Sequence, residues 1–380
     1  MSRLDRVQPP LAVLLAALGV MTVYSAGADW TRQIVWVILG GAVYAAMAAY
    51  DYRRLRALAP ALYVVMLVAL AAVHLVGHSA LGARRWLSVA GFPLEPSELA
   101  KLLLLVVLAA YLSRGAQVSW RSFAGGLGLV AAPAALVLTQ PDLGTTLVLV
   151  AVAGGTLFLA GARPAQLATI VTAGVVAVPL LPHLLHGYQR RRLEIFLDPS
   201  QDPLGAGYNL LQARIAVGSG GLFGQGWLHG LQGQLGFVPE RATDFVFASF
   251  AEEFGLLGSL VLLVLFGTLL LRLLRSATQA SDRFGELLCG GVFCMVLVQV
   301  VENVGMNVGL LPIAGIPLPL ISYGGSATIT TLAALGLVQS VTLRRKTVTY
   351  KENDPLRRLR HHLPTGGEDA LGTITRRAQA

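Results

Sequence analysis

The sequence is short of charge, because Asp, Glu, Lys and Arg together make up only 13% of its 380 residues. Water-soluble globular proteins carry about 25% charged residues. This composition therefore excludes that class and leaves no room for a large aqueous catalytic domain. Hydrophobic residues make up 55% of the chain, and the mean hydropathy is +0.66. The chain is predicted to be an integral membrane protein.

Cysteine is scarce as well, with Cys289 and Cys294 as its two copies. Both lie in one apolar run, and a helix would direct them about 140° away from each other. We expect free thiols there, and neither a disulfide nor a metal site. Internal repeats, which would suggest a secondary transporter, are also missing.

Long apolar runs dominate the rest of the sequence, and ten of them are candidates for membrane spans. They lie at 10–27, 33–50, 59–77, 97–113, 122–139, 144–160, 166–185, 246–272, 286–309 and 326–343. Since a spanning helix needs about 20 residues, we predict an all-α, polytopic membrane domain over residues 1–343. The first run has features of a cleaved signal peptide, but an uncleaved first span is simpler because further spans follow at regular intervals.

The distribution of Lys and Arg predicts the orientation of these spans. If the N-terminus is cytoplasmic, 20 of these residues lie on that side and 8 on the other, as the positive-inside rule requires. We expect both termini in the cytoplasm. The basic tail at 344–380 suits an anionic lipid surface, so the formal net charge of +9 does not call for a nucleic-acid partner.

One connection, at about 186–245 between the seventh and eighth spans, is much longer than the others and is expected outside the cytoplasm. It contains Arg190, Arg191 and Arg192 and a Gly-rich stretch. Loops of this length in compact proteins are usually functional. The three arginines are interpreted either as a lipid-headgroup anchor or as cations for catalysis.

Ionisable residues at membrane depth are costly and therefore indicate function. Glu98 and Lys101 lie one turn apart at the start of the fourth span, with Ser97 expected as the helix N-cap. They form either a helix-end ion pair, with Lys101 reaching the interface, or a cation site for a phosphate. Asp142, in the short turn at 140–144, is expected chiefly as a helix N-cap.

Asp244 closes the long connection just where the eighth span begins. A carboxylate in that place can be a simple N-cap, but beside a cavity with little water it can take a proton from an attacking hydroxyl. Glu252 and Glu253, about two turns further along, are harder to explain as structural residues. Asp244 is therefore the leading candidate for acid–base chemistry.

The ninth span carries Glu302, Asn303 and Asn307, and hydrogen bonding between helices is the structural interpretation of the two asparagines. A run rich in Pro and Gly follows at 312–325 and contains Ser322 and Tyr323. Such a run cannot remain a lipid-facing helix, because its unpaired backbone groups would face hydrocarbon. We predict a re-entrant segment that is buried in protein or lines a wet cavity.

These polar groups together indicate a cavity that opens outward. They do not separate a transporter from a membrane enzyme that acts on a lipid-linked anionic substrate. Several longer motifs do carry a resemblance. They are GARRWL at 82–87, EPSELAK at 95–101, QPDLGT at 140–145, DPLGAGYN at 202–209, ARIAVGSGGLFGQGW at 213–227, PERATDFVFASFAEEFG at 239–255 and NVGMNVGLLPIAGIPLPLISYGGSA at 303–327.

In this order, the motifs resemble the SEDS (shape, elongation, division and sporulation) family, and the resemblance covers nearly the whole chain except the tail. The pattern at 230–241 is most similar to the rod-shape branch of the family rather than the division branch. Two departures are small: Glu95 stands where the family often has Gln, and Gly233 stands where a small polar residue is common. Neither residue belongs to the chemistry expected below.

The resemblance implies a peptidoglycan glycosyltransferase of about ten spans in the bacterial cytoplasmic membrane. It implies polymerisation of lipid II at the outer face, together with a class B penicillin-binding protein and other cell-elongation proteins. Asp244 takes the family's essential-acid position. The substrate-binding residues that we expect from the motifs are Arg84, Trp86, Glu98, Lys101, Asp142, Arg241, Ser322 and Tyr323.

A mechanism follows as a hypothesis, in which Asp244 deprotonates the acceptor hydroxyl in a single inverting displacement of undecaprenyl pyrophosphate. The pyrophosphate leaves as a weakly basic anion, so it needs charge neutralisation rather than a second carboxylic acid. Lys101, Arg84, Arg241 and the three arginines at 190–192 are candidates for this role, with a divalent cation, Mg²⁺ or Mn²⁺, as an addition. The alternatives are a lipid II flippase and a non-catalytic scaffold for the penicillin-binding protein.

Overall fold

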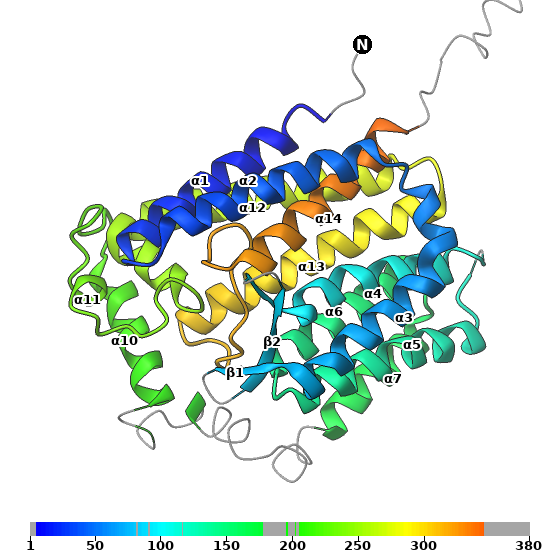
Figure 1. Ribbon diagram of the computed structural model, residues 1–380, viewed down its shortest axis with the longest axis horizontal. Helices are drawn as coiled ribbons and strands as arrows, with labels where there is room; N and C mark the ends of the chain where they lie inside the picture. Colours follow the sequence, from blue (N-terminus) through cyan, green and yellow to red (C-terminus); the bar gives the residue numbers. More distant parts are fainter. Residues whose placement is uncertain are drawn as a thin grey trace, which may run out of the picture. The chain divides into compact units, whose positions relative to one another are not determined.

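The computed structural model describes residues 5–80, 83–89, 92–115, 117–177, 195–196, 202 and 205–345. Its helices, which run side by side in Figure 1, account for all ten predicted spans within this part of the chain. They are α1 (Gln8–Ser25), α2 (Trp30–Ala49), α3 (Arg53–Val76), α4 (Pro96–Leu112), α5 (Trp120–Thr139), α6 (Leu143–Leu159), α7 (Pro164–Ala177), α12 (Val246–Thr278), α13 (Arg283–Asn307) and α14 (Gly325–Leu343). The arginines at 190–192 and the tail from 346 onward lie outside the described residues.

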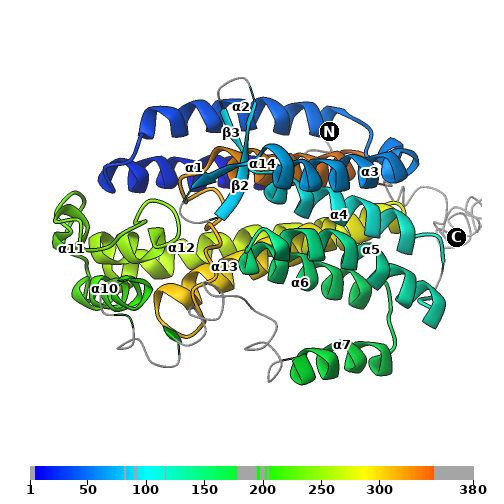
Figure 2. The same ribbon diagram turned by 60° about the horizontal axis from the view of Figure 1, so that its bottom comes forward.

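Seven of the described helices are long and apolar enough to cross a membrane, and α6 and α7 are shorter apolar helices. The most buried of these seven are α13 and α14, with 67% and 78% of their apolar windows inside the protein. Figure 2 shows these two helices between α2 on one side and α5 to α7 on the other. The prediction of a helical, polytopic membrane protein is confirmed.

Close packing between α2 and α14 depends on small residues. A Cβ atom on Gly336 would lie 2.5 Å from the Tyr44 carbonyl oxygen, and one on Gly40 would lie 2.5 Å from the Leu332 side chain. Small residues let helix backbones approach each other in membranes, where packing and not hydrophobic burial drives association. The apolar core extends from this contact through α12 and α13.

A small antiparallel sheet between α3 and α4 was not predicted from the sequence. It consists of β1 (His78–Ala80), β2 (Ala83–Val89) and β3 (Phe92–Leu94), in the order β1-β2-β3. Trp86 pairs with His78, and Leu87 pairs with Leu94. The sheet lies at the end of the bundle where α3 finishes and α4 begins.

The long connection is partly helical, with α10 (Ala206–Ser219) and α11 (Leu231–Gln234) before α12. Figure 1 places both helices near the start of α12. We call this end of the bundle, where α4, α6, α12 and α14 begin, the site end. The two cysteines are free, and Cys289 is buried in α13, as the sequence predicts.

Candidate functional site

The site end contains a long irregular stretch, residues 308–324, between α13 and α14, which we call the crossing segment. It has no regular helix or strand. Val308 and Leu310 at its start are exposed, whereas the apolar side chains further along it are buried, and these are Ile313, Ala314, Ile316, Leu318, Leu320 and Ile321. The prediction that this Pro- and Gly-rich run is irregular and buried in protein is therefore confirmed, as the absence of water in a bilayer demands.

The end of α13 and the crossing segment together hold the backbone around Asp244. Asn303 donates its side-chain N–H to the Asp244 carbonyl at 2.9 Å and to the Ile316 carbonyl at 2.8 Å. Asn307 donates to the same Asp244 carbonyl at 3.1 Å and accepts from the Ala248 amide at 3.0 Å. The two asparagines make the hydrogen bonds between elements that the structural interpretation predicted, and three of these four bonds hold the start of α12.

The three residues before Asp244 are held in the same way. The Ser322 hydroxyl donates to the Thr243 carbonyl at 2.6 Å, and the Tyr323 amide donates to the Ala242 carbonyl at 2.8 Å. The Ser249 hydroxyl donates to the carbonyl of residue 241 at 3.3 Å. Four consecutive carbonyls, from 241 to 244, are thus bonded to neighbouring elements.

Asp244 itself does not cap α12. The N-cap residue is Phe245, and it makes no side-chain cap hydrogen bond. Asp244 is partly exposed, so its carboxylate is not sealed inside the protein. The N-cap alternative for this residue is therefore wrong, and its place at the mouth of the bundle stays compatible with acid–base chemistry.

Glu98 and Lys101 form a buried ion pair at the start of α4. The Lys101 Nζ lies 2.6 Å from Glu98 Oε1, and the two side chains are only 1% and 5% exposed. The ion pair of the structural interpretation is therefore confirmed, but Lys101 is buried in the protein and does not extend to its surface. Ser97 is not the N-cap either: Glu95 occupies the N-cap position, and the Ser97 hydroxyl donates to its Oε1 at 3.2 Å.

Glu95 adds a third charge beside this pair, just before α4 and outside the helical spans. Burial, together with the carboxylates of Glu98 and Asp142, raises the pKa of Glu95 to about 8 against the opposing effect of Arg85 and Lys101. The shift follows from the cost of placing a carboxylate in a site with little water and other negative charges. Two cations and three carboxyl groups therefore share one neighbourhood.

Asp142 caps α6, as predicted, by accepting from the Thr145 amide at 3.0 Å. Its Oδ1 also lies 3.9 Å from the Arg85 guanidinium. Arg85 donates to the Pro141 carbonyl at 2.6 Å, which ties strand β2 to the turn before α6. Our sequence reasoning selected the neighbouring Arg84 and missed Arg85.

Arg84 and Trp86 occupy β2, where Arg84 pairs with Ser79. The Arg84 side chain lies outside the described part of the structure, whereas the Trp86 side chain is partly buried. Successive residues of a strand point to opposite faces, so Arg85 faces away from Trp86. This alternation is a signal that could have separated Arg85 from Arg84 if the strand had been recognised.

The crossing segment also contacts the elements around the ion pair. Beyond its end, the Ser326 hydroxyl accepts from the Glu95 amide at 2.9 Å. On the other side, Gly144 packs so closely that a Cβ atom there would lie 2.5 Å from the Ala314 carbonyl oxygen. The segment therefore lies between the Asp244 backbone and the starts of α4 and α6, and it connects the two groups of candidate residues.

Arg241 connects the site to the first two helices. Its Nε donates to the Ala26 carbonyl at 2.7 Å, in the turn between α1 and α2. Its Nη1 is buried and has no hydrogen-bond partner within the described residues. Buried donors are normally paired, so this N–H is an exception among the buried polar groups of the site.

Helix α12 is broken at Gly255, where φ is 66° and ψ is −166°. The amides of Leu256 and Leu257 donate instead to the carbonyls of residues 221 and 222, at 2.9 and 3.1 Å. The carbonyls of Glu252 and Glu253 accept from the amides of residues 225 and 226, at 2.9 and 3.0 Å. The loop at 221–226 thus replaces the helical bonds that the break removes, which satisfies the backbone at this point.

Glu252 has a structural partner in α11. Its carboxylate accepts from the Gln232 backbone amide at 2.7 Å, and Glu252 is only 1% exposed. It therefore anchors α11 to α12. This contact gives Glu252 the structural explanation that the sequence alone did not provide.

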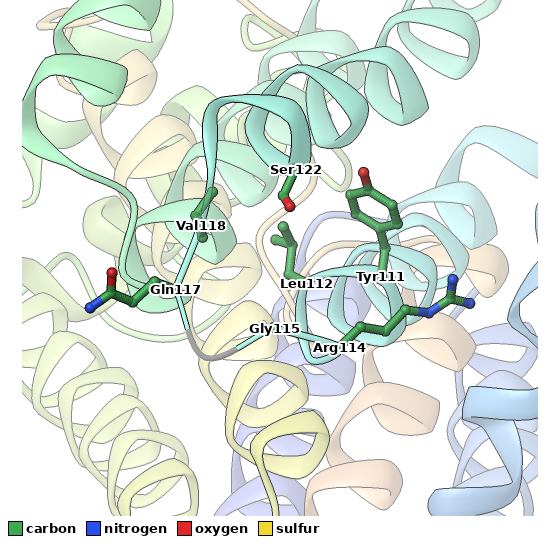
Figure 3. A pocket seen from close by; sticks show the side chains of 7 residues that line it. All are labelled: Tyr111, Leu112, Arg114, Gly115, Gln117, Val118 and Ser122. Carbon is green, nitrogen blue, oxygen red and sulfur yellow. The ribbon is translucent and has the colours of Figure 1, made fainter.

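A pocket of about 160 Å³ lies at the opposite end of the bundle, around the connection from α4 to α5 (Figure 3). Its lining residues are Tyr111, Leu112, Arg114, Gly115, Gln117, Val118 and Ser122. Drug-sized ligands need pockets of about 300 Å³ or more, and none of the predicted site residues lines this one. It is not the candidate site.

No group of three or more His, Cys, Asp and Glu side chains that could hold a metal ion occurs among the residues that the structure describes. The carboxyl groups near Lys101 are instead engaged with cations, a hydroxyl and a helix N-terminus. A metal bound by protein side chains alone does not fit this arrangement.

Comparison with known proteins gives a consistent result. A family model described as "Cell cycle protein", which covers FtsW, RodA and SpoVE, matches residues 8–347. The chain is 41% identical over 355 residues to Peptidoglycan glycosyltransferase MrdB of Escherichia coli, covering 90% of this chain and 95% of the relative. It is 38% identical over 363 residues to the probable peptidoglycan glycosyltransferase FtsW of Geobacter metallireducens, covering 90% and 96%.

Solved structures agree in fold. A structure described as "Structural coordination of polymerization and crosslinking by a peptidoglycan synthase complex" contains a chain with a TM-score of 0.80 and 35% identity, covering 90% of this chain and 99% of that one. Rod shape determining protein RodA of Thermus thermophilus has a TM-score of 0.69 and 33% identity, covering 90% and 98%. At these identities the likeness extends beyond the arrangement of helices to the sequence motifs.

Proposed function

The chain belongs to the cell cycle protein family of FtsW, RodA and SpoVE, and from this membership we propose that it is a peptidoglycan glycosyltransferase. The SEDS resemblance of its motifs is thereby confirmed. The likeness to RodA and to MrdB supports the rod-shape branch. In the proposed function, the protein polymerises lipid II into β-1,4 glycan strands during cell elongation.

The proposed location is the bacterial cytoplasmic membrane, with both termini in the cytoplasm. The excess of Lys and Arg on the side of the termini supports this orientation. The site end then faces outward, where lipid II is polymerised. Asp244, Lys101 and Arg241 would all lie at this outer face.

The observation that carries the proposal is the placement of Asp244. Asp244 is partly exposed at the site end of the bundle, while its backbone carbonyl accepts from the buried Asn303 of α13, which also donates to the Ile316 carbonyl of the crossing segment. We assign Asp244 as the general base that removes the proton from the acceptor 4-hydroxyl. The oxygen then attacks the donor anomeric carbon, and undecaprenyl pyrophosphate leaves with its bonding electrons in one inverting displacement.

The leaving pyrophosphate needs positive charge and no proton. The buried Arg241 Nη1 has no hydrogen-bond partner among the described residues, and we propose that this group contacts the anion. Lys101 lies next to Glu98, and we propose that substrate binding draws on its charge as well. Arg84, Trp86 and Tyr323 complete the proposed substrate contacts, with Asp142 fixing Arg85 and the start of α6.

A divalent cation, Mg²⁺ or Mn²⁺, is proposed as a companion of the substrate pyrophosphate and not as a resident metal. The described residues offer no complete set of metal ligands. When bound, such a cation would neutralise part of the pyrophosphate charge. The protein residues named above do not depend on it for their positions.

The proposed partner is a class B penicillin-binding protein, the transpeptidase that crosslinks the glycan strands, with other cell-elongation proteins and membrane lipid around it. The similar structure is described as a synthase complex that coordinates polymerization and crosslinking, which supports a crosslinking partner here. No feature of the described residues calls for nucleic acid.

The flippase alternative is not favoured, because the similar curated proteins are named glycosyltransferases. The decisive experiment compares glycan formation by wild type and Asp244→Asn, each purified with its penicillin-binding protein and supplied with lipid II and Mg²⁺. We expect Asp244→Asn to lose activity by about 10² or more, as for a missing general base. Wild-type activity in this variant would contradict the assignment of Asp244.

A further inference from the structure

The backbone of Asp244 is held more tightly than its partly exposed side chain suggests. Its carbonyl accepts two side-chain N–H groups, from Asn303 at 2.9 Å and from Asn307 at 3.1 Å. The carbonyl of the preceding Thr243 accepts from the Ser322 hydroxyl at 2.6 Å. Side-chain amides and hydroxyls thus determine where the last residues before α12 lie.

The three donors are themselves buried and fully engaged. Asn303 and Asn307 are 0% exposed and Ser322 is 2% exposed. Asn303 uses both amide hydrogens, since it also donates to the Ile316 carbonyl at 2.8 Å. The Ser322 oxygen also accepts from the Leu318 amide at 2.8 Å. Ser322 therefore has no free hydroxyl to offer a substrate, although it was among the expected substrate-binding residues.

Buried polar side chains are costly unless each is paired, and Leu would fill the space of Asn without that cost. The buried Asn303, Asn307 and Ser322 side chains affect the position of the Asp244 carboxylate. With the Asp244 backbone fixed, only two side-chain torsions determine where its carboxylate lies. A general base must come within about 3 Å of the proton that it removes, and a displacement of about 1 Å can reduce turnover by about 10²-fold.

We propose that Asn303, Asn307 and Ser322 are positioning residues, which fix the Asp244 carboxylate by binding the backbone carbonyls of residues 243 and 244. This inference rests on the proposed function, in which Asp244 is the general base. The three residues do not contact the substrate. They act through the position of Asp244, so their loss is expected to slow the chemical step and to leave lipid II binding unchanged.

The test uses the full-length protein with its penicillin-binding protein, lipid II as substrate, and the variants Asn303→Leu and Ser322→Ala. We expect each variant to lower kcat at least about tenfold while KM for lipid II stays within about twofold of wild type. Hydrogen exchange at 239–248, measured by mass spectrometry, is expected to become faster in both. Ser322→Ala removes one hydroxyl only, so it carries the test if Asn303→Leu does not fold.

Two comparisons make the outcome specific. Gln299→Leu changes a buried polar side chain one turn away on α13, 2% exposed, and is expected to leave kcat and exchange unchanged. In the Asp244→Asn background, Asn303→Leu should cause no further loss, because both act on the same group. The positioning proposal alone is overturned if the losses of kcat from Asn303→Leu and Asp244→Asn multiply in the double variant. It is also overturned if both Asn303→Leu and Ser322→Ala keep the wild-type kcat. Wild-type kcat in Asp244→Asn overturns the general-base assignment itself.

Discussion

Gly255 approaches Gly224 so closely that a Cβ atom on Gly255 would lie 2.3 Å from the Gly224 backbone nitrogen. Both residues have positive φ, 66° and 81°, a conformation that glycine adopts at little cost. The contact occurs where α12 breaks and the loop at 221–226 supplies the missing backbone hydrogen bonds. The break is therefore the point where the long connection joins helix α12 through backbone hydrogen bonds.

Gly224→Ala is expected to disturb this junction. The added Cβ would lie 2.1 Å from the Glu253 carbonyl oxygen, and the positive φ adds backbone strain. We expect the free energy of unfolding to fall by about 2 kcal/mol or more, measured as thermal unfolding in detergent. Gly221→Ala is the matched control, because its φ is 52° but no atom lies within 4 Å of the added Cβ. It should lose only about 1 kcal/mol, and equal losses would argue against the close contact.

Lys101→Met is expected to leave the Glu98 carboxylate buried without its cation. The pair is 2.6 Å apart and almost completely buried, and breaking such a pair costs about 3–5 kcal/mol. Thermal unfolding should therefore show a large loss of stability in the single variant.

The double variant Lys101→Met with Glu98→Gln separates the structural role of this pair from its chemical role. Removing both charges should recover most of the lost stability. Glycan formation should stay low if the Lys101 charge serves the leaving pyrophosphate. A stable and fully active double variant would limit the pair to a structural role.

Asp142→Ala is expected to destabilise the protein by about 1 kcal/mol, because α6 loses its N-cap. Asp142→Asn keeps an oxygen that can accept from the Thr145 amide, and Asn is as good an N-cap as Asp. Its unfolding temperature should stay close to that of wild type. If Asn is as destabilising as Ala, the charge facing Arg85 matters more than the cap.

The spans and the buried, irregular crossing segment could be predicted because each depends on local properties. Length and apolar content define a spanning helix, and Pro and Gly exclude one in lipid. The free cysteines and the Asp142 cap followed from helix geometry and residue type in the same way. The candidate site residues were predicted from sequence motifs, which can be recognised without knowledge of the structure.

The remaining features depend on contacts between distant parts of the chain. The sheet at 78–94 lies between two spans in a stretch too short to show a clear strand period, so its strands and the role of Arg85 were missed. The break in α12 is stabilised by a loop about 30 residues earlier. Asn303 and Ser322 bind carbonyls about 60 to 80 residues away. Residue type alone does not determine such pairings, which is why Ser322 was expected to bind substrate.

Glu95 should make the stability of the protein depend on pH. Burial and the neighbouring carboxylates raise its pKa from an ordinary value of 4.5 to about 8 in the folded state. A raised pKa means that the folded state binds the proton more tightly than the unfolded state does. The stabilising contribution is therefore complete below about pH 4.5 and is lost as pH rises through 8.

Glu95→Gln, which places the residue common in the family at this position, removes the titrating group and keeps its size. We expect the variant to unfold at a higher temperature than wild type at pH 8 to 9, and at nearly the same temperature near pH 5. Glu286→Gln, which changes a carboxylate 46% exposed, should leave the difference between the two pH values as in wild type. If the unfolding temperatures of Glu95→Gln and wild type fall in parallel from pH 5 to 9, the folded protein does not favour the neutral form of Glu95. The proton would then not be held by Glu95 in the group of carboxylates around Lys101.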